Sequence, residues 1–269
     1  MSYVPLASAA GRVHVCAHRG HSIGAPENTL PALVEAAKRG ATVAEIDVVL
    51  TADDEVVLLH DEILDRTTSG KGRAAALTLA EIRALDAGAW FSPAFAGTRV
   101  PTLAEALAEA RRHGMGLLVE IKERQRAARM IERLAAVLTA ERAAGDVLVI
   151  SFDHVSLVEM RRRLPEARTE LITHARHVDI RAVAERAGAA SVAIEADMFH
   201  PDDGRALHDA GVAVRVTLPR PDRIAARLAY GLDIEGPIRE ALGHGLIDVL
   251  AGDDTDHIAG LVTAYGRLG

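Results

Sequence analysis

Short apolar runs alternate along the chain with amphipathic stretches. Between several of the runs, apolar positions recur at helical spacing, as over residues 31–41, 102–114, 129–145 and 179–189. The runs themselves are rich in Val, Ile, Leu and Ala and predict eight β-strands, over residues 12–18, 42–50, 115–122, 146–152, 168–173, 190–195, 212–218 and 246–252. Eight strands, most of them followed by a helix, predict an α/β fold, the (β/α)8 TIM barrel.

A doubly wound open sheet has a similar alternation of strands and helices. It fits this chain less well, because the strand count reaches eight and no Gly-x-Gly-x-x-Gly motif follows the first strand. We therefore expect a single barrel domain over residues 1–269.

One stretch interrupts the alternation between the second strand and its helix. A strand-like segment at 55–62, a helix-like segment at 77–88 and an aromatic loop at 89–101 lie there. A βα connection needs only a few residues, so residues of about 51–100 are predicted to form a small insertion on the carboxyl-end face, where barrel active sites lie. Trp90, Phe91 and Phe95 either form its small core or line one side of a substrate pocket.

Composition and charge narrow the function. Of the 269 residues, 49% are hydrophobic and 26% charged, which is typical of a soluble protein. The net charge of −7 argues against nucleic acid as a partner, because phosphate backbones require a basic footprint. No segment resembles a signal peptide or a membrane span, so we expect a cytoplasmic protein without stable membrane insertion. Cys16 is the single cysteine, which excludes an internal disulfide.

Two strands carry pairs of charged residues at i and i+2. Glu45 and Asp47 share one face of their strand, and Glu120 and Lys122 share one face of the next. Three carboxylates that converge at a barrel mouth repel one another unless a cation neutralises them. Oxygen ligands favour Mg²⁺, Ca²⁺ or Mn²⁺ over zinc. The alternative is a set of strand-end charges that face solvent or cap their neighbours.

Two histidines and two cations also follow apolar runs. His18 and Arg19 end the first strand, and Gly20 allows the chain to turn after them. His60 ends the strand-like segment of the insertion. Two histidines beside a metal can share general acid and base work, and Arg19 and Lys122 could hold an anion such as phosphate.

The segment "PENT" begins a helix, where Glu27 or Asn28 is expected to act as a cap. No Gly-x-Ser-x-Gly motif is present, which argues against a serine hydrolase of that type.

Several of these motifs occur together in an order that resembles glycerophosphodiester phosphodiesterases, a family with a phosphatidylinositol phosphodiesterase-like TIM barrel. They are "AHRG", "APENTLPA", "AEIDVVLTADDEVVLLHDEILDRTTSGKG", "LTLAEIRALDAGAWF", "VPTLAEAL", "LVEIK" and "SFD". The resemblance is nearly continuous over residues 13–123 and weaker afterwards.

The resemblance implies hydrolysis of a small glycerophosphodiester to glycerol 3-phosphate and an alcohol. It implies a divalent cation on Glu45, Asp47 and Glu120 and an acid–base pair formed by His18 and His60. It further implies that the substrate phosphate is bound by Arg19 and Lys122, with support from Glu27.

The C-terminal half departs from the family pattern. Where the family commonly has Trp-Thr-Val-Asn on strand seven, this chain has Val216, Thr217, Leu218 and Pro219. Arg215 and Glu195 either reshape that side of the pocket or are ordinary barrel-end residues. The sequence therefore does not define the alcohol, and it makes no prediction of oligomeric state. A lysophospholipase D or sphingomyelinase D-like enzyme and a non-catalytic binding barrel are the alternatives.

Overall fold

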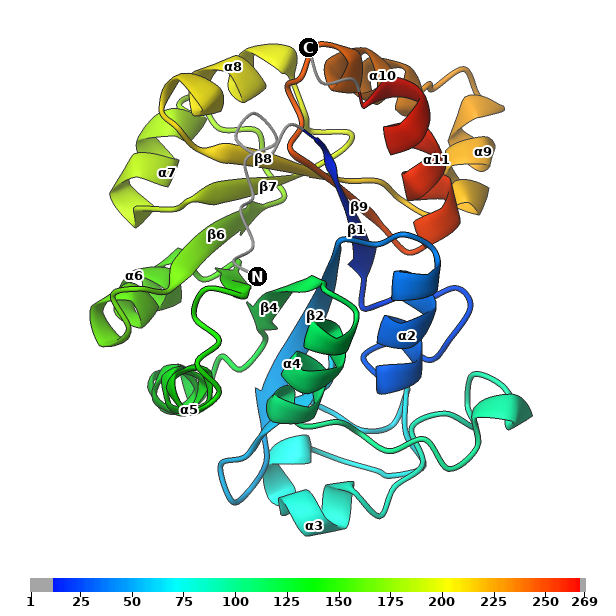
Figure 1. The fold of residues 1–269 in the computed structure, drawn as a ribbon, viewed down its shortest axis with the longest axis vertical. Coiled ribbons are helices and arrows are strands. Elements are labelled where there is room, and N and C mark those ends of the chain that lie inside the picture. The colour runs from blue at the N-terminus through cyan, green and yellow to red at the C-terminus, as the bar shows by residue number, and fades with distance from the viewer. Residues whose placement is uncertain (1–11, 267–269) are drawn as a thin grey trace.

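Eight parallel strands close into a barrel in the computed structural model, which describes residues 12–266 (Figure 1). The order around the ring is β1-β9-β8-β7-β6-β5-β4-β2, and β2 pairs with β1 to close it. The strands are β1 (His14–His18), β2 (Val43–Leu50), β4 (Gly116–Ile121), β5 (Val147–Ser151), β6 (Arg168–Thr173), β7 (Ser191–Glu195), β8 (Ala213–Thr217) and β9 (Val249–Gly252). The predicted TIM barrel is confirmed, and ring closure excludes the open sheet.

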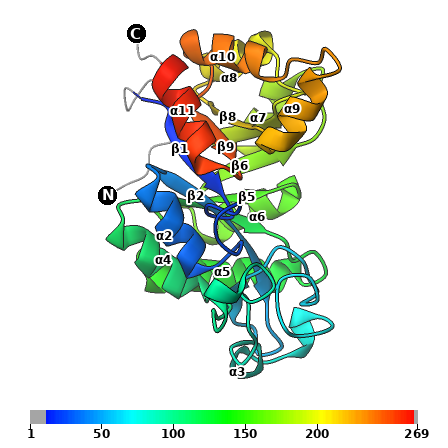
Figure 2. The ribbon, with the colours of Figure 1, turned by 90° about the vertical axis from the view of Figure 1, so that its right-hand side faces the viewer.

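Helices surround the barrel, and each of the predicted helices is present but is shorter than predicted; α2 and α5 begin one and two residues earlier than predicted (Figures 1 and 2). Within residues 12–266, none of them is long and apolar enough to cross a membrane. They are α2 (Leu30–Lys38), α4 (Leu103–Arg112), α5 (Ala127–Ala140), α6 (His154–Arg163), α7 (Ile180–Ala187), α8 (Pro201–Asp209), α9 (Pro221–Leu228), α10 (Glu235–Gly243) and α11 (Thr255–Tyr265).

The core has two parts because both faces of each barrel strand are buried. The larger cluster of aliphatic side chains lies between the strands and the helices. Inside the barrel, alternate residues of the strands form a small cluster of Cys16, Val43, Leu118, Leu148, Ile150, Ile172, Ala193, Val249 and Ala251. A buried ion pair also lies inside the barrel, where Arg215 Nε donates to Glu170 Oε1 at 2.8 Å.

The insertion between β2 and α4 lies beyond the arrowhead of β2, apart from the ring of helices (Figures 1 and 2). It holds β3 (Val56–Leu58), η1 (Ala74–Ala76), α3 (Leu79–Ile82) and η2 (Pro93–Phe95). Its core is aliphatic and is built on Val49 and Val57 with Leu59, Leu64, Ala74, Ile82, Ala87 and Val100.

Two elements of the insertion are shorter than predicted. β3 pairs antiparallel with residues 48–50 of β2 and cannot extend to residue 62, because β1 occupies the same edge of β2 up to Glu45. The helix predicted over 77–88 stops at Ile82, because the carboxylate of Asp86 accepts hydrogen bonds from the backbone N–H groups of Gly88, Ala89 and Gly97 and holds a loop instead.

A buried carboxylate joins three elements at the amino end of the barrel. Asp248, just before β9, accepts from Val214 N of β8 at 2.7 Å, and its own N–H donates to Val214 O. His208 of α8 lies 2.7 Å from Asp248 Oδ2 through Nε2. This hydrogen bond raises the pKa of His208, although burial of the ring opposes the increase.

Because the folded-state pKa of His208 is raised, the stabilisation that it gives is complete below the ordinary histidine pKa of about 6.5 and is lost as the pH rises through the folded-state pKa. We therefore expect His208→Ala to lower the free energy of unfolding by about 1 kcal/mol at about pH 6 and by less at about pH 9. Urea unfolding at both pH values measures this difference. The control is His244→Ala, whose ring is exposed; a pH-independent cost of His208→Ala would contradict the charged hydrogen bond.

Candidate active site

The turn after β1 places two side chains at the barrel mouth. Arg19 has a φ of +57°, in the left-handed region that non-glycine residues rarely adopt. This backbone conformation is held on both sides: Arg19 N donates to Glu45 Oε2 at 3.1 Å, and Arg19 O accepts from Asn28 N at 3.1 Å. Gly20 continues the turn with a φ of +78°. The turn leaves the His18 ring at the end of the strand, with its Nε2 3.9 Å from Glu45 Oε2.

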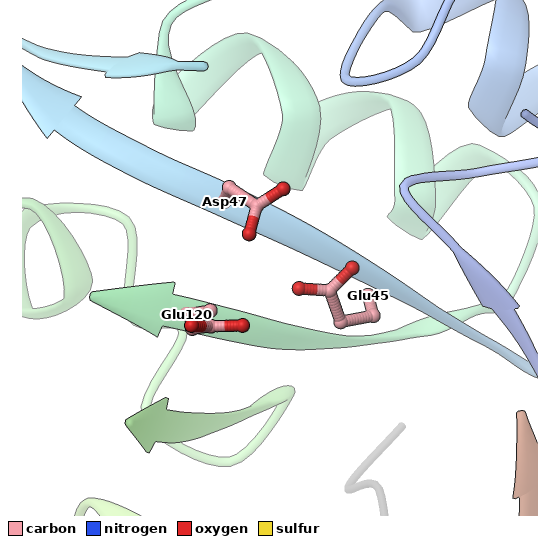
Figure 3. Close-up of side chains that lie close together, drawn as sticks. All are labelled: Glu45, Asp47 and Glu120. Carbon is pink, nitrogen blue, oxygen red and sulfur yellow. The ribbon is translucent and has the colours of Figure 1, made fainter. Parts of the chain in front are cut away.

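Three buried carboxylates from two neighbouring strands lie together at this mouth (Figure 3). Glu45 and Asp47 project from β2 and Glu120 from β4, and one oxygen of each lies within 4.8 Å of the others. The cluster follows from the register, because Asp47 pairs directly with Glu120 across the two parallel strands. The i and i+2 spacing that singled out these residues in the sequence thus produces a three-carboxylate cluster.

The charges of this cluster affect one another strongly. Burial, and then the charge of Asp47, raises the pKa of Glu45 to about 7. The same two causes raise the pKa of Glu120. Burial opposes ionisation of Asp47 as well, but the positive charges of Lys122 and Arg19 hold its pKa below the ordinary value. Lys122 Nζ lies 3.1 Å from Asp47 Oδ1 and 2.6 Å from Glu120 Oε1.

Asn28 belongs to this site, which the sequence analysis did not predict. Its Nδ2 donates to Asp47 Oδ2 at 2.8 Å, and its Oδ1 accepts from Asp47 N at 2.9 Å. The expected helix cap at Glu27 or Asn28 is wrong, because Thr29 is the N-cap of α2 and accepts from Ala32 N. With the cap supplied by Thr29, the Asn28 amide is free to orient the Asp47 carboxylate.

A second residue missing from the sequence analysis supports His18. His18 Nδ1 donates to Asp253 Oδ1 at 2.5 Å, and Asp253 directly follows β9. Burial would lower the pKa of His18, but this hydrogen bond and the charge of Glu45 raise it above the ordinary value. The bond fixes the tautomer and leaves Nε2 directed toward the carboxylate cluster.

A chain of hydrogen bonds joins His60 in the insertion to the turn after β1. His60 Nδ1 lies 2.7 Å from Asp61 Oδ1, and Arg66 Nε donates to Asp61 Oδ2 at 2.7 Å. Arg66 also donates to both carboxylate oxygens of Glu27 at 2.8 Å, and Glu27 Oε1 accepts from Arg19 at 2.9 Å. Glu27 therefore contacts Arg19 and Arg66. Among the described residues, it has no hydrogen bond or ion pair with the carboxylate cluster or with His18.

One cavity of about 450 Å³ joins these groups. It is lined on one side by His18, Arg19, Glu27, Glu45, His60, Glu120 and Lys122, so every predicted site residue except Asp47 reaches it. Trp90, Phe91 and Phe95 are absent both from the described residues that line it and from the aliphatic core of the insertion, so the structure supports neither predicted role for them. Trp90 and Phe91 instead meet edge to face near the surface of the insertion.

The carboxylate cluster fits a hard divalent cation. Its donors are all oxygen atoms, and Glu45 Oε1 is buried without a hydrogen-bond partner among the described residues. An unpaired buried carboxylate oxygen is costly in a folded protein unless a ligand supplies the missing charge. Glu45, Asp47 and Glu120 could therefore hold such an ion.

A barrel with carboxylates, histidines and cations at the carboxyl ends of its strands defines a class of metal-assisted or acid–base enzymes. The sequence model of the glycerophosphoryl diester phosphodiesterase family matches residues 18–233. The chain belongs to this family.

Relatives and solved structures agree with this membership. The chain is 38% identical over 159 residues to a glycerophosphodiester phosphodiesterase of Caldanaerobacter subterraneus and 34% identical over 181 residues to one of Bacillus subtilis. These matches cover 59% and 62% of this chain, and 65% and 61% of the relatives, which is less than two thirds of their length.

Among solved structures, an Oleispira antarctica phosphodiesterase in complex with the product sn-glycerol-3-phosphate matches with a TM-score of 0.81 and 28% identity. This match covers 95% of this chain and 99% of the other. A glycerophosphodiester phosphodiesterase of Agrobacterium tumefaciens matches with a TM-score of 0.73 and 28% identity, over 92% and 99% of the two chains.

The turn after β1 gives a stability prediction with a matched control. A Cβ at Gly20 would lie 2.6 Å from Ala32 Cβ and 2.7 Å from its backbone carbonyl carbon. We expect Gly20→Ala to lower the free energy of unfolding by about 3 kcal/mol, through both the clash and the positive φ. Gly40 has a similar φ of +81° with no atom within 4 Å of an added Cβ, so Gly40→Ala should cost only about 1 kcal/mol. Equal costs in denaturant unfolding would show that the packing of Gly20 on α2 is unimportant.

Proposed function

We propose that this protein hydrolyses small glycerophosphodiesters to glycerol 3-phosphate and an alcohol with the help of a divalent cation. The carboxylate cluster, the two supported histidines and the two cations in one cavity carry this proposal. Membership in the family supports the reaction class. We also propose a cytoplasmic location and a substrate that arrives as a small dissolved molecule.

Glu45, Asp47 and Glu120 would hold the cation, with Mg²⁺, Ca²⁺ or Mn²⁺ as candidates for this oxygen donor set. When bound, the ion supplies positive charge to the phosphoryl oxygens in the transition state.

Arg19 and Lys122 would bind the phosphate. Both line the cavity and both are mostly buried, so their charges act where water screens them little. Arg19 is oriented by Glu27, which in turn is held by Arg66. In this arrangement Glu27 supports substrate binding through Arg19 rather than by its own contact.

His18 and His60 would share the proton transfers. His18 is rooted in β1 beside Arg19, with Nδ1 occupied by Asp253, so Nε2 is available to the phosphoryl group and the attacking oxygen. His60 lies in a loop of the insertion, and Asp61 occupies its Nδ1, which leaves Nε2 for the departing alcohol oxygen. Each histidine is thus held by a carboxylate in one tautomer, an arrangement suited to general acid–base catalysis.

The metal proposal has a direct test. Chelator-treated protein should lose phosphodiesterase activity and regain it with Mg²⁺, Ca²⁺ or Mn²⁺. In Glu45→Gln, the affinity for the activating ion, measured by calorimetry, should fall at least about tenfold. Loss of a residue that only hydrogen-bonds to a metal ligand already costs about tenfold in affinity, and loss of the ligand itself should cost no less. Glu109→Gln, a buried carboxylate on α4 outside the site, is the control. Full activity at negligible metal content would exclude the metal from the mechanism.

The histidine roles differ in their response to the leaving group. A general acid matters most for a poor leaving group and little for a stable one. His60→Ala should therefore lose far more activity on a glycerophosphodiester than on a nitrophenyl diester, whereas His18→Ala should lose activity on both. The measurement is kcat/KM for both substrates in both variants, converted to differences in transition-state free energy. The opposite pattern would exchange the roles, and small equal losses would exclude both histidines.

A further inference from the structure

The wall of the cavity opposite the carboxylate cluster is built by Glu195 at the end of β7 and by the segment that runs from β8 into α9. β8 lies four strands from β4 around the eight-stranded ring and therefore faces it across the mouth. The residues from the end of β8 into the first turn of α9 that line the cavity are Arg215, Thr217, Leu218, Pro219, Arg220 and Arg223. Three of these six side chains are arginines.

The deepest of the three arginines is already neutralised. Arg215 is buried, and its guanidinium donates to the Glu170 carboxylate at 2.8 Å through Nε and contacts it at 2.8 Å through Nη2. Arg215 Nη1 also donates to Thr217 Oγ1 at 3.2 Å. The Arg215–Glu170 ion pair is held rigidly at the inner end of the cavity, and its two charges largely cancel.

The acidic side chains that line the cavity have partners elsewhere. Asp253 accepts from His18, and Glu27 accepts from two arginines. Glu195 Oε1 lies 3.5 Å from the His174 ring. Glu45 and Glu120 belong to the carboxylate cluster. None of these contacts is a hydrogen bond or ion pair with Arg220 or Arg223. Burial would raise the pKa of Asp253, but its hydrogen bond with His18 and the charges of His18, Arg19 and Arg220 lower it, so Arg220 acts on Asp253 through its charge alone.

The two outer arginines have little compensation. Arg220 Nε lies 3.5 Å from Asp222 Oδ1, which is longer than a hydrogen bond. The side chains of Arg220 and Asp222 are each more than half exposed. Arg223 makes no ion pair with any carboxylate of residues 12–266. Arg227, one turn further along α9, differs because it lies 3.1 Å from Asp197 and does not line the cavity.

We infer that Arg220 and Arg223 form an anion-binding subsite for the alcohol half of the substrate. This inference rests on the proposed function. With the phosphodiester between Arg19 and Lys122, the alcohol would extend toward the opposite wall, where it would meet Arg223, which has no ion pair, and Arg220, whose only ion pair among the described residues is the long, exposed one with Asp222. A carboxylate or a phosphate on the alcohol would give charge-assisted hydrogen bonds there, and an ammonium group would be repelled. The preferred substrates are thus glycerophosphodiesters with an anionic alcohol.

The test uses three diesters that share the glycerophosphate half. Their alcohols are glycerate, glycerol and ethanolamine, which are anionic, neutral and cationic and of similar size. At low ionic strength we expect kcat/KM for the glycerate diester to exceed that for the glycerol diester by about tenfold. This is the size of effect that two partly exposed ion pairs, from Arg220 and Arg223 to the glycerate carboxylate, can give. The ethanolamine diester should be the poorest, and added salt should reduce the differences.

Variants assign the preference to the two arginines. In Arg220→Gln/Arg223→Gln the glycerate-to-glycerol ratio should fall close to one, Arg223→Lys should retain most of it, and Arg227→Gln should retain all of it. A wild-type enzyme that cleaves the glycerol diester without favouring glycerate would overturn the inference and leave the proposed function standing, as would a ratio unchanged in the double variant. Hydrolysis of none of the three would instead remove the proposed function, and the subsite with it.

Discussion

The structure of the barrel mouth depends on one constraint, the burial of three carboxylates within a few ångströms of one another. Like charges at this distance destabilise a folded protein unless nearby groups compensate them. Lys122 directly follows the strand that carries Glu120 and contacts two of the carboxylates. The other compensation comes from the segment after β1, through the backbone N–H and side chain of Arg19 and the Asn28 amide. The left-handed conformation of Arg19 is a consequence, because it aims that N–H at Glu45.

The same compensation extends from the barrel into the insertion. Arg19 requires a counter-charge, which Glu27 supplies, and Glu27 is shared with Arg66 of the insertion. Burial alone would raise the pKa of Glu27, but the contacts with the two arginines lower it, so the carboxylate stays ionised. Arg66 then holds Asp61, which orients His60. The position of the loop histidine is therefore fixed by ionic contacts that begin at β1, although β3 itself pairs with β2 through only three residues.

Local patterns in the sequence were sufficient for the barrel and for most candidate site residues. Buried parallel strands are apolar on both faces, and polar residues at their carboxyl ends stand out against this background, as Glu45 and Asp47 do. Residues that only the fold brings into contact could not be predicted from local patterns. Asp253 is 235 residues from His18 in the sequence, and only closure of the ring brings β9 beside β1. Asn28 was misjudged for a different reason, because an Asn at a helix start is usually a cap, and only the structure shows that Thr29 takes this role.

The two halves of the barrel contribute differently to the cavity. The carboxylate cluster and both histidines come from β1, β2, β4 and the insertion, and Arg19 and Lys122 directly follow β1 and β4. This is the region in which the family resemblance is nearly continuous. The opposite wall comes from the ends of β7 and β8 and from α9, and at residues 216–219 of this wall the chain departs from the family pattern. The groups on the first side hold one another in place, so a substitution there disturbs several contacts at once. Arg220 and Arg223 lie on an exposed segment without such ties. The half of the site proposed to carry the reaction is thus physically constrained, whereas the wall proposed to face the alcohol can change its charge without disturbing that half.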